Sequence, residues 1–330
     1  MRGRMRLLRP HPALLFLLAM GAGLMLGVFG PVAIPVDPII MVLLGLLFLE
    51  VRLGGGRELL RSRRAVVVVL GLNFLILPAV ALGVTALIVP DDDLVRLGLL
   101  IYLLFPCTDW FLGFTRVAGG STALGAALIP VSLVLQLLLY PVWISALSGR
   151  SLPGVVEALW PALLEGLLVP AGVAVVLRVL IGLLGGRAVL ERVQGIAGGC
   201  VPWAIAALIL GLFSSGLGEA ALEPATLGRV LAGVVMFFAV SLALSELVRR
   251  WAGLAEDEVT LVVFTTTARN APLMLAVTAL ALGENAVITA VIVLGMLLEF
   301  PHLTALTWWM RRRRRGARRP RAATPLTTAA

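Results

Sequence analysis

The sequence predicts an all-α membrane protein of ten transmembrane helices, built as two inverted five-helix repeats in which helices four and nine are broken. Three observations lead to this fold class. Hydrophobic residues make up 60% of the 330 residues and charged residues only 14%, a balance too apolar for a soluble domain. Apolar segments long enough to cross a bilayer recur along the whole chain. Two of these segments are interrupted by polar residues next to a proline.

Ten segments have the length and composition of a membrane span. They lie at residues 12–30, 33–53, 65–89, 95–118, 122–147, 159–184, 193–217, 225–248, 258–282 and 285–310. The first follows four arginines, as a signal peptide would, but its apolar stretch continues to Phe29 without a small-x-small cleavage site, so we expect it to be retained. The predicted organisation is a cytoplasmic N-terminus at 1–11, repeats at 12–147 and 159–310, and a disordered arginine-rich cytoplasmic tail at 311–330.

The placement of arginines predicts the orientation in the membrane. All 27 basic residues are arginines. If the N-terminus is cytoplasmic, 23 of them fall in cytoplasmic segments, and only Arg96, Arg150 and Arg229 fall outside. Positive residues gather on the cytoplasmic side of membrane proteins, so both termini are predicted to be cytoplasmic. The net charge of +9 therefore reports topology and predicts no nucleic-acid partner, although the run of arginines at 311–315 suits anionic lipid.

Ten spans divide into five and five, and an odd number per half inverts the second half relative to the first. The sequence carries a trace of such a repeat. Glycines mark the ends of span four, at Ala118-Gly119-Gly120, and of span nine, at Ala281-Leu282-Gly283, each about 14 residues past its interruption. Gln136 and Glu299 both lie 16 residues beyond these glycines, and a proline soon follows each of them.

The interruptions, at residues 105–109 and 265–272, place polar groups at membrane depth. A broken helix is tolerated there only when it packs against protein or lines a cavity, and two such breaks are typical of the central site of a secondary transporter. Other classes fit less well. A receptor would need a soluble sensing domain, and no loop is long enough for one. An intramembrane enzyme would need a metal-ligand cluster or a nucleophile–base pair, so we expect neither enzymatic activity nor a cofactor.

Two residues are candidates for direct contact with cargo or coupling ion. Cys107 offers a soft thiol at the first break, suited to a thiophilic substrate, although many membrane cysteines are apolar filler; Cys200 has only glycines beside it and is interpreted as packing. A carboxylate as deep in a span as Glu299 must be paired, hydrated or protonated, and such groups often relay protons. The alternative, that Glu299 caps an early helix end, is opposed by the apolar run at 303–310, and His302 is interpreted as a structural hydrogen-bonding residue.

The second break adds a cation and an amide. Arg269 is costly at membrane depth without a partner, and Asp109 in the first break is the obvious candidate if the breaks meet. Such a pair could be a structural clamp or could bind substrate. Asn270 can donate and accept hydrogen bonds at the exposed half-helix end, and Asn73 is expected to be a hydrogen-bonding brace.

These residues resemble those of a known family. The stretch from Cys107 to Gly120, with the cysteine 13 residues before the glycine of a Val-Ala-x-Gly turn, is similar to the fourth span of Acr3-type arsenite efflux permeases. Residues 295–301 resemble that family's last-span motif Gly-x-Leu-x-Glu-x-Pro, Asn270 fits its broken ninth span, and Asn73 fits its third. The resemblance implies a ten-span fold shared with bile acid:sodium symporters, with a scaffold panel and a core in which spans four and nine cross.

The resemblance also implies roles. In arsenite permeases the residues that match Cys107 and Glu299 are tied to transport, which makes protons the expected coupling ion. Sodium-coupled relatives carry an acidic residue and a glutamine near the ninth-span break, where this chain has Arg269, so a sodium site is not expected there. The sequence therefore predicts arsenite efflux by proton antiport at the cell membrane, with Cys107, Glu299, Asn270, Arg269 and Asp109 around the substrate. Asp109 and Arg269 depart from the arsenite pattern, and a small organic anion bound by Arg269 is the alternative.

Overall fold

A computed structural model describes residues 12–30, 34–50, 55–108, 110–148, 168–214, 223–282 and 285–317. The described residues are almost entirely helical, and none of them forms a strand. In chain order the helices are α1 (Pro12–Phe29), α2 (Val36–Glu50), α3 (Gly56–Arg61), α4 (Arg63–Gly71), the π-helical turn η1 (Leu72–Ile76), α5 (Leu77–Ile88), α6 (Asp93–Leu104), α7 (Phe111–Ala118), α8 (Thr122–Ser148), α10 (Val169–Ser214), α11 (Pro224–Trp251), α12 (Glu256–Thr267), α13 (Ala271–Leu282) and α14 (Ala286–Ala317).

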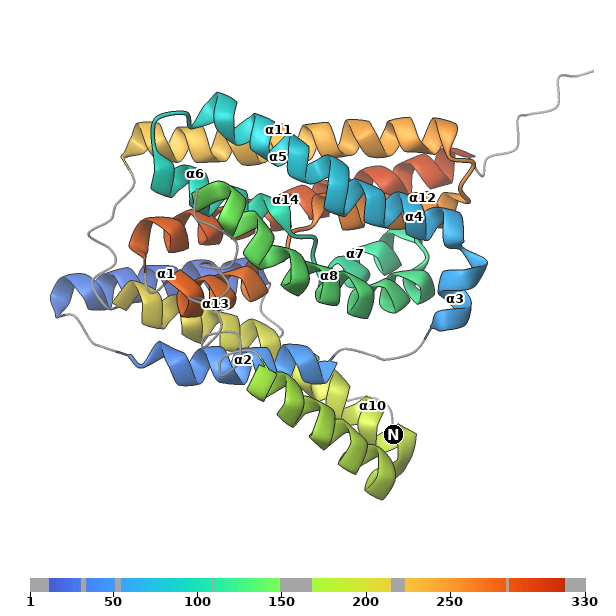
Figure 1. Ribbon diagram of the computed structural model, residues 1–330, viewed down its shortest axis with the longest axis horizontal. Coiled ribbons are helices and arrows are strands. Elements are labelled where there is room, and N and C mark those ends of the chain that lie inside the picture. Colours follow the sequence, from blue (N-terminus) through green and yellow to red (C-terminus); the bar gives the residue numbers. More distant parts are fainter. Residues whose placement is uncertain are drawn as a thin grey trace, which may run out of the picture.

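The helices form two groups (Figure 1). Helices α1, α2 and α10 pack mainly on one another and make up the first group, at the bottom of the view. The second group contains α4 to α8 and α11 to α14, in which α14 packs along α6 and α11 packs along α5 and α12. The groups meet chiefly where α13 contacts α2 and where α14 contacts α1 and α10. A continuous apolar core runs through this contact and includes Phe16, Ile40, Tyr102 and Phe300.

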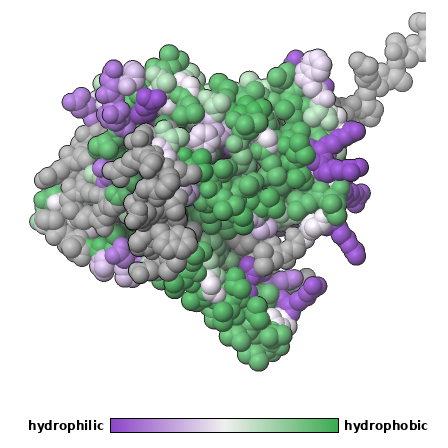
Figure 2. Space-filling model, viewed as in Figure 1, coloured by the Kyte–Doolittle hydropathy of each residue, from purple (hydrophilic) through white to green (hydrophobic). Residues whose placement is uncertain are grey.

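Five helical stretches of the described chain are long and apolar enough to cross a membrane. They are Arg63–Ile88, Thr122–Trp143, Val169–Gly211, Pro224–Trp251 and Ala286–Arg314. Helix is present in each of the ten predicted spans, whereas membrane crossing by the shorter or broken ones stays a prediction. Large apolar side chains such as Val176, Leu183 and Trp203 are exposed, and much of the visible surface is hydrophobic (Figure 2). Such a surface is stable in lipid and would aggregate in water, which supports a multi-pass membrane protein.

Both predicted interruptions are confirmed. The first separates α6 from α7, and the second separates α12 from α13. A proline favours the interruption at each break. Pro106 disfavours helical backbone in the residue before it, and Phe105 is extended. Pro272 has no N–H to bond the Ala268 carbonyl four residues earlier and would clash with it in a continuous helix, and Ala268 is extended. Helix α7 then ends at Gly119, whose φ of 81° is left-handed and suits glycine at a helix C-terminus.

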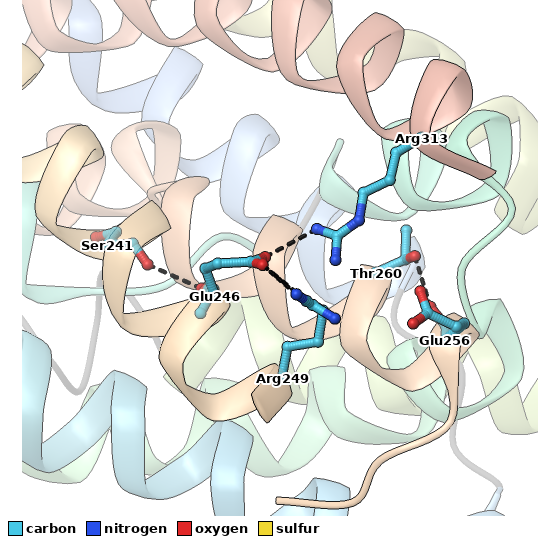
Figure 3. Close-up of polar contacts among 7 residues, drawn as sticks. Ser241, Glu246, Arg249, Glu256, Thr260 and Arg313 are labelled. Atoms are coloured by element: carbon cyan, nitrogen blue, oxygen red, sulfur yellow. Dashed lines mark hydrogen bonds and ion pairs between the residues drawn. The ribbon is translucent and has the colours of Figure 1, made fainter. Parts of the chain in front are cut away.

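Helix α14 continues to Ala317, seven residues into the segment 311–330 for which the sequence predicts a disordered tail. The reason is that its arginines find partners. Arg312 stacks on Trp308 at 3.7 Å and Arg313 lies 5.5 Å from the Trp309 ring centroid. Arg313 also donates to the Glu246 carboxylate on α11 at 2.8 Å, beside the Arg249–Glu246 pair (Figure 3). The ion pair between Arg313 and Glu246 therefore links the arginine-rich end of α14 to α11.

Candidate functional site

The two breaks lie side by side. Pro106 and Arg269 form an isolated antiparallel bridge, in which the Cys107 N–H donates to the Ala268 carbonyl at 3.0 Å and the Asn270 N–H donates to the Phe105 carbonyl at 2.9 Å. These bonds satisfy backbone groups that broken helices would otherwise leave unpaired in the membrane. Four helix ends meet at this crossing: the negative C-terminal ends of α6 and α12 and the positive N-terminal ends of α7 and α13.

Glu299 reaches the crossing from the middle of α14. Its side chain is completely buried. One carboxylate oxygen accepts a hydrogen bond from the Trp110 indole at 2.7 Å, and the other accepts from the Tyr102 hydroxyl at 3.1 Å. The same hydroxyl lies 2.8 Å from the Gly295 carbonyl, so its single proton is shared between two acceptors. A Cβ at Gly295 would come within 2.5 Å of the Tyr102 ring, so glycine at this position is what lets α6 and α14 approach closely enough for the contact.

Arg269 is also completely buried, and it is the largest such side chain among the described residues. Its guanidinium donates to the backbone carbonyls of Leu103, Thr265 and Thr266 and to the side-chain oxygen of Asn73, at 2.5 to 3.1 Å. The Phe237 ring centroid lies 5.2 Å from the guanidinium carbon, within cation–π range. The Nε of Arg269 has no hydrogen-bond partner. Asn73 therefore stabilises the second break by a hydrogen bond, as expected, and the group that it binds is the Arg269 guanidinium.

An amide pair completes the crossing. Gln136 from α8 donates to the Pro106 carbonyl at 2.9 Å and accepts from the Asn270 side chain at 2.7 Å. The Asn270 amide also donates to the Thr108 hydroxyl at 3.1 Å. The Asn270 side-chain oxygen, which is buried, has no partner. Cys107 is 3% exposed and belongs to a cluster of buried apolar side chains beside the breaks, whereas Cys200 is exposed.

A cavity of about 1450 Å³ lies between the two helix groups. Thr108 and Trp110, beside the first break, belong to its lining, together with Phe300. Its other walls come from α2, α7, α8, α10, α13 and α14, and the arginines that line it are Arg116, Arg311 and Arg312. The Trp110 and Phe300 rings, 4.9 Å apart, belong to its wall, while Glu299 and Arg269 do not. The Trp110 indole therefore contacts the cavity on one side and the buried carboxylate on the other.

The crossing thus gathers four of the five predicted site residues: Cys107, Arg269, Asn270 and Glu299. The fifth, Asp109, lies outside the described residues, and so does its expected contact with Arg269. Sequence reasoning did not single out Tyr102 and Trp110, which hold Glu299. One signal was available: the chain has only two tyrosines, and both prove to be completely buried in the apolar core. In the part of the chain that the structure describes, no cluster of side chains could hold a metal ion.

Comparison with known proteins identifies a family. The model of the sodium bile acid symporter family matches residues 37–221, more than half of the chain. The match takes in the first break and its surroundings, including Asn73, Cys107 and Gln136. A search of curated proteins gave no match.

Proposed function

The chain belongs to the sodium bile acid symporter family, whose members are membrane transporters of small molecules, and we propose that this protein exports arsenite across the cytoplasmic membrane by proton antiport. The observation that carries the proposal is that a thiol and a carboxylate lie around one helix crossing, where Tyr102 and Arg269 each interact electrostatically with both Cys107 and Glu299. Trp110, which donates to Glu299, follows Cys107 by three residues and faces the cavity. A thiophilic cargo and a proton can therefore be bound within one connected site.

In the proposed cycle the cavity is the cytoplasmic entrance. The arginines at its wall fall on the cytoplasmic side in the predicted topology. Neutral arsenite enters and makes a transient arsenic–sulfur contact with Cys107, which selects a thiophilic centre. Glu299 alternates between its protonated and ionised forms. Alternating access requires a ligand that binds the two facings differently, and competition between proton and arsenite at the crossing supplies that difference.

The proposed fold behind this cycle is ten spans in two inverted repeats. Its support is the way two side chains flank the bridge between Pro106 and Arg269. Gln136 on α8 binds the carbonyl of Pro106, and Glu299 on α14 interacts with the backbone of Arg269. Since the two side chains occupy corresponding positions in the sequence halves, an inverted repeat accounts for both contacts at once.

The test is arsenite uptake into everted membrane vesicles that contain the protein, with an imposed proton gradient and no sodium. We expect gradient-dependent accumulation, and we expect Cys107→Ser to abolish it while the variant remains in the membrane. Cys200→Ser is the matched control, because Cys200 is exposed and distant in sequence from the crossing; it should transport normally. Accumulation of arsenite by Cys107→Ser at the wild-type level would show that the thiol is not needed for transport.

A second candidate cargo is a small organic anion. It is favoured by the lining of the cavity, where Arg116, Arg311 and Arg312 combine with apolar walls in a volume far larger than arsenite needs. In this alternative Arg269 pairs with a carboxylate or sulfonate. The alternative predicts that Arg269→Gln destroys transport and that Cys107→Ser does not. The hydrogen bonds that already occupy the Arg269 guanidinium favour arsenite over this reading.

A further inference from the structure

Arg269 is held in an unusual way for a buried arginine. All four of its acceptors are neutral oxygens, three from the backbone and one from Asn73. Among the described residues no carboxylate lies within ion-pair distance of it, because both ion pairs found there belong to Glu246. Buried arginines are normally paired with anions. Within the described part of the chain the guanidinium is held by carbonyl oxygens, with Glu299 near enough for electrostatic attraction but not for an ion pair, so the way these oxygens favour a cation needs a physical explanation.

The position of those oxygens supplies it. The Leu103 carbonyl belongs to the last turn of α6, and the Thr265 and Thr266 carbonyls belong to the last turn of α12. The C-terminal end of a helix carries partial negative charge, and two such ends point at one guanidinium. In secondary transporters, the ends of broken helices and unwound backbone carbonyls are the groups that coordinate a small cation. The ring of Phe237 adds a further cation-binding surface.

We propose that Arg269 is a tethered cation, which permanently fills a cation site made by the C-terminal ends of α6 and α12 and by Asn73. The family to which the chain belongs is named for sodium, yet the residues at this site do not fit sodium, since a fixed guanidinium uses the oxygens that would coordinate it. The break is therefore stabilised without a dissociable ion at this position. The inference is independent of the cargo, because it concerns only what occupies the crossing.

This role makes a prediction that an ordinary structural arginine does not. Removing the side chain as far as Cβ should leave the oxygens in place around a vacant space of guanidinium size. A free cation should then bind there and restore stability, since a ligand that binds only the folded state raises Tm. An arginine that merely fills space or links helices would leave no cation site, and added cations would restore nothing.

The experiment is thermal unfolding of the purified full-length protein in detergent, without arsenite. Wild type, Arg269→Ala and a control, Arg178→Ala, are compared in choline, sodium and guanidinium chloride at equal ionic strength, up to about 50 mM and well below the molar range in which guanidinium denatures proteins. Arg178 is a suitable control because it too donates to a backbone carbonyl, that of Phe48, but away from the crossing. We expect Arg269→Ala to lower Tm by about 5–10 °C in choline. Guanidinium should recover about half of that loss in this variant and nothing in the control.

Two results overturn the proposal. One is the absence of any rescue of Arg269→Ala by guanidinium or sodium. The other is a stabilisation of the wild type by sodium that Arg269→Ala abolishes, since the arginine would then support a sodium site instead of filling one. If Arg269→Ala fails to accumulate, Arg269→Ser, which leaves the same space vacant, undergoes the same titration. Loss of arsenite transport has no bearing on either result, so failure of this proposal and failure of the proposed function are distinguishable.

Discussion

Two glutamates of this protein show opposite ways of placing a charge in a membrane helix. Glu246, near the end of α11, is about 28% exposed and binds two arginines, Arg249 on its own helix and Arg313 on α14 (Figure 3). Glu299, in the middle of α14, is completely buried and is held by the neutral donors of Tyr102 and Trp110. The first carboxylate is neutralised by full charges beside water. The second accepts hydrogen bonds from neutral donors only, and the nearby cation Arg269 forms no ion pair with it.

The arginines show the same contrast. Arg249 and Arg313 meet a carboxylate, whereas Arg269 meets carbonyl and amide oxygens. At the crossing the chain therefore keeps a buried cation and a buried anion in one electrostatic neighbourhood without joining them in an ion pair. An ion pair would lock both groups in a single charge state, and separating them leaves the carboxylate able to take up and release a proton. The difference favours a structural role for Glu246 and supports the coupling role that we propose for Glu299.

The largest effect is expected for Glu299→Gln. The amide is nearly the same shape and its oxygen can still accept from Trp110, so the fold should persist, but it cannot release a proton. We expect gradient-driven arsenite accumulation in vesicles to fall at least about tenfold, the kinetic equivalent of about 1.4 kcal/mol, while exchange of labelled arsenite without a gradient continues. Accumulation at the wild-type level would remove Glu299 from the coupling role.

Much of this site could be predicted from the sequence because its members violate the rules of their surroundings. A proline, a cysteine and a cluster of polar residues inside apolar segments located both breaks, and a lone carboxylate among leucines located Glu299. These signals can be read from the local sequence, since a charge inside the membrane is costly whatever the arrangement of the surrounding helices.

The partners of these residues could not be predicted in the same way. Asn73 and Arg269 are 196 positions apart in the sequence, and Tyr102 and Glu299 are 197 positions apart. Whether such residues meet depends on how the helices cross, and a tyrosine or tryptophan in an apolar segment is usually unremarkable packing. The expected Arg269 partner was a charge, because charge pairing is the common solution. The partners of Arg269 among the described residues are instead helix-end carbonyls and Asn73, which no single residue in the sequence indicates, and the contact expected with Asp109 stays a prediction.

An intermediate effect is expected for Trp110→Phe. The phenyl ring preserves packing against Phe300 but removes the donor that makes the shortest hydrogen bond to Glu299. We expect the rate of gradient-driven transport to fall by about threefold to tenfold, which is about 0.7–1.4 kcal/mol. This is less than the roughly 1.5–3 kcal/mol of a hydrogen bond to a charged group, because Tyr102 remains as a donor. Trp203→Phe, on the exposed face of α10, is the control and should leave the rate unchanged. Equal rates in both variants would show that the indole only fills space.

The smallest effect is expected for Glu246→Gln. Both of its ion pairs are partly exposed, and partly exposed pairs contribute little because water and salt screen them. We expect Tm to fall by less than about 3 °C and arsenite accumulation to stay within about twofold of wild type. High salt should lower the Tm of the wild type by a similarly small amount, because salt screens the partly exposed ion pairs of Glu246. Salt should not reproduce the effect of a substitution at the buried Glu299. A loss of transport as large as that of Glu299→Gln would break the contrast between the two carboxylates, because the end of α14 would then be coupled to the chemistry at its centre through Arg313.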